Sequence, residues 1–255
     1  MTTKKYTAKL LPKKRVEVTD SSGWTHVITG RTNVRKPSDI CSQLSALQMS
    51  DKIPLELLVE EHMRYVNVWQ ESECWQKVVK ILQDNVLSNS RIRLTNCVCL
   101  GLGSLSAGKE SSKYEVAALV IILRLLGEAH AIEKVIFQDP AFNDVDEAFL
   151  TGLGYHTVST PAGFESINQH TFCFAPHLEH DVFAMALRPA HPALCIGNSD
   201  ILADRPLQSS AVDSKETLKV FRPFINATSS TTMPDFQQDT WCQFTSIYWL
   251  HDDAQ

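Results

Sequence analysis

Residues 97–104 read CVCLGLGS, a short apolar run that ends in glycines and a serine. Three later stretches repeat this pattern of an apolar run followed by polar residues: 135–140 (VIFQDP), 172–177 (FCFAPH) and 194–199 (LCIGNS). Runs of this length and composition predict strands that are buried on both faces. In open α/β sheets, ligands bind in the crevice outside the carboxyl ends of parallel strands. The four stretches therefore predict one shared pocket at one edge of a sheet.

Helical patterns alternate with these apolar runs along the chain. The predicted order is strand 96–100, helix 113–129, strand 134–138, helix 143–152, strand 155–158, strand 170–175, helix 178–187 and strand 193–197. Such an alternation predicts right-handed crossovers and a mostly parallel sheet with helices on both faces. The predicted fold class is therefore α/β, a Rossmann-like three-layer sandwich.

A long helix is predicted upstream of the sheet. Apolar residues recur at helical spacing from Leu55 to Leu82, and Pro54 suits a first helical turn. We expect this helix to end near Leu87 and to be broken near Ser72.

The predicted organisation is one domain, residues 53–255, preceded by a mostly flexible basic extension, residues 1–52. Within the extension, residues 24–28 are a candidate for a short strand or an anchor. Residues 203–239 contain serine and threonine clusters and several prolines, which predict a polar surface excursion. The β-forming residues of 240–250 predict a final strand that returns to the sheet.

Composition indicates a soluble globular protein. A chain of 255 residues with 44% hydrophobic content can bury a substantial core. No run approaches the roughly 18 apolar residues of a spanning helix, and the first residues do not resemble a signal peptide. We therefore expect a protein of the cytoplasm, the nucleus or both, with no membrane partner.

The cysteines predict neither a disulfide framework nor a metal site. Cys97, Cys99, Cys173 and Cys195 lie inside predicted strands, and their spacing is not that of a zinc ribbon. They are interpreted as reduced core residues.

Positive charge is concentrated near the beginning of the chain. Residues 1–36 carry nine Lys or Arg and two acidic residues, a net charge of +7, which leaves −12 elsewhere because the whole chain carries −5. Such an arm can bind nucleic acid or serve as a nuclear address, although a solvated tail is the simpler interpretation. The acidic remainder argues against nucleic-acid binding outside the arm, and protein partners stay open.

The loop with Gly101 and Gly103 follows a predicted strand, where glycines let a backbone approach a ligand phosphate closely. The dinucleotide fingerprint is incomplete, because Ser106 stands where a third glycine is expected. The loop therefore leaves several ligands open. These are S-adenosylmethionine or another nucleotide-like ligand, and a nicotinamide or flavin cofactor. The loop is also open to being a tight strand-to-helix turn that binds no nucleotide, and haem stays open as a cofactor of the protein.

Asp139 either accepts hydrogen bonds from a ribose diol or caps the turn into the next helix. His177 is interpreted as a pocket histidine, with metal binding alongside His180 as the weaker alternative. A hydrolase triad is not favoured, because Ser104 does not stand in a G-x-S-x-G elbow. The candidate ligand-binding residues are Gly101, Gly103, Ser104, Asp139, His177, Asn198 and Ser199.

The ordered motifs resemble those of a known family. They are GLGS at 101–104, DP at 139–140, PH at 176–177 and GNS at 197–199. Together they resemble the SRR-like domain family, named for the plant protein "sensitivity to red light reduced". The resemblance covers roughly residues 60–200, and residues 23–27 and 244–250 are similar to fungal members.

The resemblance implies a regulatory protein of the cytoplasm and nucleus. Relatives are linked to light and circadian-clock input in plants and to microtubule function in yeast, and no established reaction is implied. The residues themselves leave one enzymatic alternative, a methyltransferase-like protein that binds an adenosyl ligand, with Asp139 holding the ribose.

Overall fold

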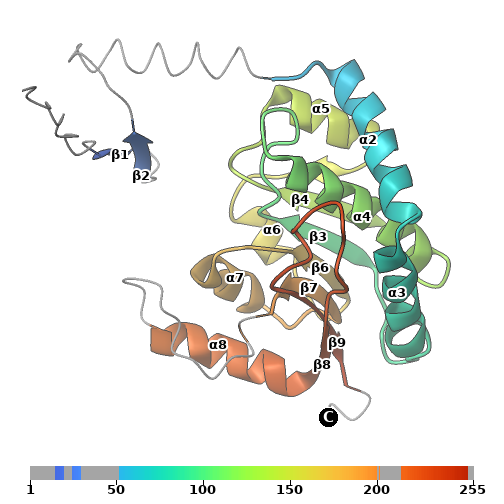
Figure 1. Cartoon of the computed structure of the whole chain (residues 1–255). Coiled ribbons are helices and arrows are strands. Elements are labelled where there is room, and N and C mark those ends of the chain that lie inside the picture. Colours follow the sequence, from blue (N-terminus) through green and yellow to red (C-terminus); the bar gives the residue numbers. More distant parts are fainter. Residues whose placement is uncertain (1–14, 20–24, 30–51, 200, 202–213, 252–255) are drawn as a thin grey trace, which may run out of the picture. The chain divides into compact units, whose positions relative to one another are not determined.

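The computed structural model describes residues 15–19, 25–29, 52–199, 201 and 214–251 (Figure 1). The chain divides into two compact units, residues 1–51 and 52–255. In the first unit, β1 (Arg15–Thr19) pairs antiparallel with β2 (Thr25–Thr29). The short strand expected at residues 24–28 is present as β2, whereas β1 lies in a part predicted to be flexible. The remaining residues up to 51 lie outside the described ranges.

The second unit is built on a seven-stranded sheet with the order β5-β4-β3-β6-β7-β9-β8. Five neighbouring strands run parallel: β3 (Asn96–Leu100), β4 (Lys134–Gln138), β5 (His156–Thr157), β6 (Thr171–Ala175) and β7 (Leu194–Asn198). The antiparallel strands β9 (Thr245–Leu250) and β8 (Thr228–Thr232) extend the sheet beyond β7. The predicted mostly parallel sheet is confirmed.

Helices cover both faces of this sheet (Figure 1). One face is covered by α2 (Leu55–Gln70), α3 (Glu73–Leu82), a π-helical turn (Gln83–Leu87), α4 (Glu110–Gly127) and α5 (Asp144–Gly152). The other face is covered by α6 (Ala162–Glu165), α7 (His180–Leu187) and α8 (Ser214–Ala227). Each face of the sheet packs into its own hydrophobic core, and successive strand residues point to opposite faces. Cys97 lies in the core on the α4 side of the sheet, and Val98 lies in the core on the α7 side. The predicted three-layer α/β sandwich is confirmed.

The long helix predicted over residues 54–87 is divided at Ser72. The Ser72 hydroxyl accepts a hydrogen bond from the backbone N–H of Trp75 at 3.0 Å and caps α3. α2 packs against α4, which lies between α2 and the sheet. This position explains why α4 is apolar on nearly all sides rather than along one stripe.

The prediction of a surface excursion over residues 203–239 is wrong for the part that the structure describes. Residues 214–227 form α8, in which Phe221 and Phe224 are fully buried. The serine and threonine run that follows forms β8, an edge strand of the sheet. Polar residues are tolerated there because one side of an edge strand meets solvent.

The final strand begins later than predicted. β9 starts at Thr245, and residues 240–244 form turns instead of extended backbone. Phe244 has a φ of 58°, a left-handed conformation that a strand cannot contain.

The order in which the chain adds strands reverses between β3 and β6. From β3 the chain builds β4 and β5 on one side, and it then places β6 and β7 on the other. At such a switch point, the connections leaving the two central strands diverge and leave a crevice beyond their carboxyl ends. Here the crevice lies beyond Leu100 and Ala175.

His62 on α2 is a buried histidine, with its ring edge-on to Phe149 at a centroid distance of 5.2 Å. Its Nδ1 has no hydrogen-bond partner among the described residues. Burial, followed by the positive charge of Arg124, lowers the pKa of His62 to about 4. Protonation of His62 is therefore unfavourable in the folded protein.

We expect His62 to make the fold sensitive to acid. Because its folded pKa is below the ordinary 6.5, its contribution is fully present above pH 6.5 and is lost as pH falls toward 4. Between pH 7.5 and 4.5 the wild type should lose about 2 kcal/mol more unfolding free energy than a His62→Phe variant. Urea unfolding of both proteins across this range measures the difference, and parallel curves would contradict it.

Candidate functional site

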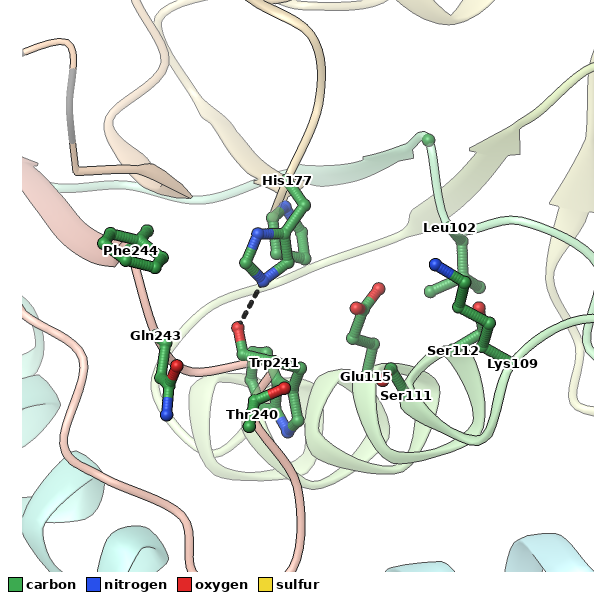
Figure 2. Close-up of a pocket in the computed structure, with 12 residues that line it drawn as sticks. Leu102, Lys109, Ser111, Ser112, Glu115, His177, Thr240, Trp241, Gln243 and Phe244 are labelled. Atoms are coloured by element: carbon green, nitrogen blue, oxygen red, sulfur yellow. Dashed lines mark hydrogen bonds between the residues drawn. The ribbon is translucent and has the colours of Figure 1, made fainter. Parts of the chain in front are cut away.

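A cavity of about 400 Å³ opens at the switch point between β3 and β6 (Figure 2). Its walls come from the β3–α4 connection with the first turns of α4, from the start of the β6–α7 connection, and from the 240–244 segment. The lining residues are Gly101, Leu102, Lys109, Ser111, Ser112, Glu115, Pro176, His177, Thr240, Trp241, Gln243 and Phe244. We call this cavity the switch-point pocket.

A second cavity, which we call the side hollow, lies next to the pocket and measures about 300 Å³. It is lined by His177, Leu178, Glu179, His180, Asn198 and Phe244. His177 and Phe244 line both cavities. These two residues therefore form the boundary between them.

Glu115 is the most unusual side chain of the pocket. It is 6% exposed, and its carboxyl group points into the cavity from α4 (Figure 2). Within the described part of the chain, this carboxyl group forms no hydrogen bond or ion pair. Burial, and then the negative charges of Asp239 and Asp139, raise the pKa of Glu115 well above its ordinary range. A buried, unpaired carboxyl group destabilises a fold, and such groups concentrate at functional sites.

His177 and Phe244 both have left-handed backbone conformations, with φ of 56° and 58°. This conformation costs a non-glycine residue about 1 kcal/mol or more, and it persists where the surroundings hold it in place. His177 Nε2 lies 2.6 Å from the backbone oxygen of Trp241, and the Phe244 carbonyl accepts a hydrogen bond from the backbone N–H of Ser199 at 2.8 Å. These bonds tie the connection after β6 and the end of β7 to the 240–244 segment.

The predicted glycine loop is held by Asp139. The carboxylate of Asp139 accepts hydrogen bonds from the backbone N–H groups of Gly103 and Ala141, both at 2.7 Å. Gly103 has a φ of 76°, which suits glycine. Of the two interpretations of Asp139, the geometry matches the one in which it stabilises the turn.

Asp146 of α5 holds the next part of the same loop. It is completely buried, and its Oδ1 accepts hydrogen bonds from the backbone N–H groups of Leu105 at 3.1 Å and Ser106 at 2.8 Å. Its Oδ2 accepts from the backbone N–H of Asn143 at 3.1 Å, which completes a capping box at the start of α5. One carboxylate therefore joins α5 to the loop that leads into the pocket wall.

The structure brings three of the predicted site residues to the two cavities. Gly101 and His177 line the switch-point pocket, and Asn198 lines the side hollow. Gly101 has a φ of 72°, which suits glycine, and a Cβ atom there would clash with the Leu178 side chain of the connection after β6.

The other predicted residues lie at the same edge of the sheet but do not line either cavity. Gly103 and Asp139 bind each other, and Ser104 Oγ accepts hydrogen bonds from the backbone N–H of Ala107 at 3.0 Å and from Asn143 Nδ2 at 3.1 Å. Ser199 contacts the 240–244 segment through its backbone. These residues position the loops that border the site.

The sequence analysis missed Glu115 and the whole 240–244 segment. A single acidic residue in the apolar run from Tyr114 to Leu123 was a signal for Glu115. Asn143 and Asp146, three residues apart, were a signal for the capping box. No local signal places residues 240–244 beside His177, because that contact depends on the position of β9 in the sheet.

Other kinds of site find no support in the ranges that the structure describes. No three His, Cys, Asp or Glu side chains among the described residues are placed to share a metal ion. In the same ranges, no helix combines the length and apolarity needed to cross a membrane. The six cysteines that the structure describes are buried and free: Cys74, Cys97, Cys99, Cys173, Cys195 and Cys242.

Comparison with known families identifies the domain. A family model described as the SRR1 domain matches residues 67–249. The chain belongs to the SRR1 domain family. The match confirms the resemblance that the ordered motifs indicated. The SRR1 domain spans β3 to β9 and so includes every residue that lines the pocket and the side hollow.

Among solved structures, the SRR1 domain protein is similar to a crystal structure of a Thermoplasma acidophilum protein. The two share 9% sequence identity, with 73% of this chain and 94% of that chain covered and a TM-score of 0.35. The comparison with curated proteins gave no match.

Proposed function

We propose that this SRR1 domain protein is a regulatory binding protein whose switch-point pocket takes a small polar ligand. The observation that carries the proposal is the Glu115 carboxyl group, buried and unpaired among the described residues, which faces a cavity of about 400 Å³. The left-handed conformations of His177 and Phe244 at the same cavity also support it. Backbone strain of this kind is concentrated at ligand-binding sites.

In this proposal the ligand is not held by a ribose contact with Asp139, the contact considered in the sequence analysis. Both oxygens of the Asp139 carboxylate accept backbone hydrogen bonds, so the proposal gives Asp139 no ribose to bind. A nucleotide-like ligand remains compatible if it enters between α4 and the 240–244 segment. The methyltransferase-like alternative relied on Asp139 as a ribose ligand and has less support.

The cellular role in this proposal is the one that the resemblance to SRR-like proteins implies. We propose that ligand binding serves signalling, circadian-clock input or cytoskeleton-related regulation in the cytoplasm, the nucleus or both. The ligand would act by setting the positions of the 240–244 segment and the α7 side of the pocket, since both border it.

A thermal-shift screen tests the proposal. The panel contains S-adenosylmethionine, nicotinamide and flavin cofactors, nucleotides, haem, and small amines, alcohols and carboxylic acids. A ligand present at 100 times its Kd and specific for the folded state adds about 2.7 kcal/mol of stability. For a chain of this length, we expect a rise in Tm of about 5–10 °C.

A matched pair of variants locates the binding. Gln243 is exposed and lines the pocket, whereas Gln237 is exposed and does not. Gln243→Trp should fill the pocket and abolish the shift, and Gln237→Trp should leave it unchanged. The proposal is wrong if no compound raises Tm, or if both variants respond like the wild type.

A further inference from the structure

The geometry points to a ligand with a positively charged nitrogen group that carries N–H donors, such as a primary ammonium or a guanidinium group. This inference rests on the proposed function and specifies the chemical class of the ligand. It follows from the Glu115 carboxyl group, which faces the pocket and forms no hydrogen bond or ion pair within the described part of the chain. The indole Nε1 of Trp241, a donor without a partner among the described residues, is itself buried.

Glu115 provides the central acceptor. Its carboxyl group faces the cavity from the second turn of α4, and no group of the described residues donates a hydrogen bond to it (Figure 2). The neighbouring Asp239 cannot supply a donor, because its carboxylate accepts hydrogen bonds from Ser111 Oγ and from the backbone N–H of Trp241. A cationic ligand group would give Glu115 a charge-assisted hydrogen bond in a place where solvent screens it weakly.

Asn198, in the wall of the side hollow, carries a second acceptor without a partner, and that atom is enclosed by the protein. Asn198 is 8% exposed, and its Nδ2 donates to the backbone oxygen of Leu178. The Leu178 oxygen can only accept, so this bond fixes the orientation of the amide and leaves Oδ1 on the other side. Asn198 Oδ1 is buried and has no partner among the described residues.

His177 contributes a further acceptor between the two cavities. Because the backbone oxygen of Trp241 can only accept, His177 Nε2 must carry the hydrogen of that 2.6 Å contact. In the neutral ring, Nδ1 is then an acceptor. Glu115 and His177 therefore both offer an acceptor at the pocket, and the enclosed Asn198 Oδ1 adds a third acceptor of the same polarity behind the wall of the side hollow.

Phe244 adds an aromatic surface suited to a cation. Its side chain is 74% exposed although it lines both cavities, and its backbone is held in a left-handed conformation. The face of an aromatic ring attracts an ammonium or guanidinium group that lies within about 6 Å of its centre.

Lys109 is the positively charged group that lines the pocket, and Figure 2 shows its ammonium nitrogen directed toward the side on which Glu115 lies, with no ion pair between the two. It precedes the first residue of α4, its side chain is exposed, and its charge is therefore screened by water and salt. Glu115 is buried, so its interaction with a ligand is screened much less. The deep part of the pocket consequently favours a cation over an anion.

Isothermal titration calorimetry with three compounds of similar length tests the inference. These are 1,4-diaminobutane, the neutral 1,4-butanediol and the anionic succinate, and agmatine adds a guanidinium group. We expect the diamine or agmatine to bind the wild type, and the diol and succinate to bind at least tenfold more weakly.

Two matched variants assign the charge to Glu115. Glu115→Gln should weaken diamine or agmatine binding at least tenfold while the Tm of the unliganded protein stays the same or rises. Glu128→Gln makes the same change of carboxyl to amide just beyond the other end of α4 and should leave binding unchanged. Phe244→Leu, which keeps an apolar side chain but removes the ring, should weaken binding about threefold to tenfold.

The outcomes separate the inference from the proposed function. If a neutral or anionic compound of the screen binds in the pocket and Glu115→Gln leaves its affinity unchanged or improves it, the inference is wrong and the proposed function stands. If both glutamate variants weaken diamine binding equally, the attraction is general to an acidic protein and the inference is also wrong. If no compound of any class binds, the proposed function fails and the inference fails with it.

Discussion

Asp146→Ala should lower the free energy of unfolding by about 3–5 kcal/mol, a large effect for one substitution. The wild-type carboxylate is completely buried and accepts hydrogen bonds from the backbone N–H groups of Leu105, Ser106 and Asn143. Alanine leaves these donors without their partner, and each buried donor left unsatisfied costs about 1–3 kcal/mol. The loop after β3 and the first turn of α5 should both become less stable.

Asp144→Ala is the matched control, because Asp144 lies on the same first turn of α5. Its side chain is 85% exposed and forms a surface ion pair with Lys52 at 3.1 Å, which contributes little to stability. Urea unfolding should show a loss of under about 1 kcal/mol for this control. Equal losses for the two variants would show that Asp146 does not hold the loop in the way described.

Trp69→Ala should lower the free energy of unfolding by about 3–5 kcal/mol through the cavity that it creates. Trp69 is completely buried on α2, with its ring 4.9 Å from that of Phe236 and 5.2 Å from that of Trp241. Trp241 is part of the 240–244 segment, so the same packing supports a wall of the switch-point pocket. Ligand binding should therefore weaken together with stability.

Trp69→Phe tests how much of the loss comes from removing the whole ring, because phenylalanine keeps an aromatic ring but lacks the indole N–H. The indole Nε1 of Trp69 has no hydrogen-bond partner among the described residues. Replacement by phenylalanine therefore reduces the volume of the side chain but removes no hydrogen bond. We expect it to cost under about 1.5 kcal/mol. Trp75→Ala on α3 is the control for removal of a half-buried tryptophan and should cost clearly less than Trp69→Ala. A loss for Trp69→Phe as large as that for alanine would contradict this account of the packing.

The parallel core of the fold could be read from the sequence for a specific physical reason. Strands buried on both faces are uninterrupted apolar runs, and residues 97–100, 135–137, 172–174 and 194–196 show this directly. By contrast, β8 reads as a serine and threonine loop, because an edge strand needs little apolar surface. The sequence analysis also missed the apolar face of α8, although Val220, Phe221, Phe224 and Ile225 recur there at helical spacing.

The candidate site was predicted in its location and only partly in its composition. Polar residues that follow parallel strands must share an edge, which is why Gly101, His177 and Asn198 reach the cavities. The pattern could not show that Asp139 accepts one hydrogen bond from the backbone N–H of Gly103, in the loop after β3, besides the local one from Ala141. Hydrogen bonds between segments far apart in the chain depend on the folded positions of both.

By itself, the sequence determined the alternation of strands and helices, the break at Ser72 and the edge of the sheet at which polar residues collect, because each depends on residues close together in the chain. Only the tertiary structure decided the strand order, with its reversal between β3 and β6. It also placed the 240–244 segment next to His177. It also decided that Glu115 on α4 faces the pocket as an unpaired acid among the described residues. These features depend on long-range pairing and burial, and no window of neighbouring residues contains that information.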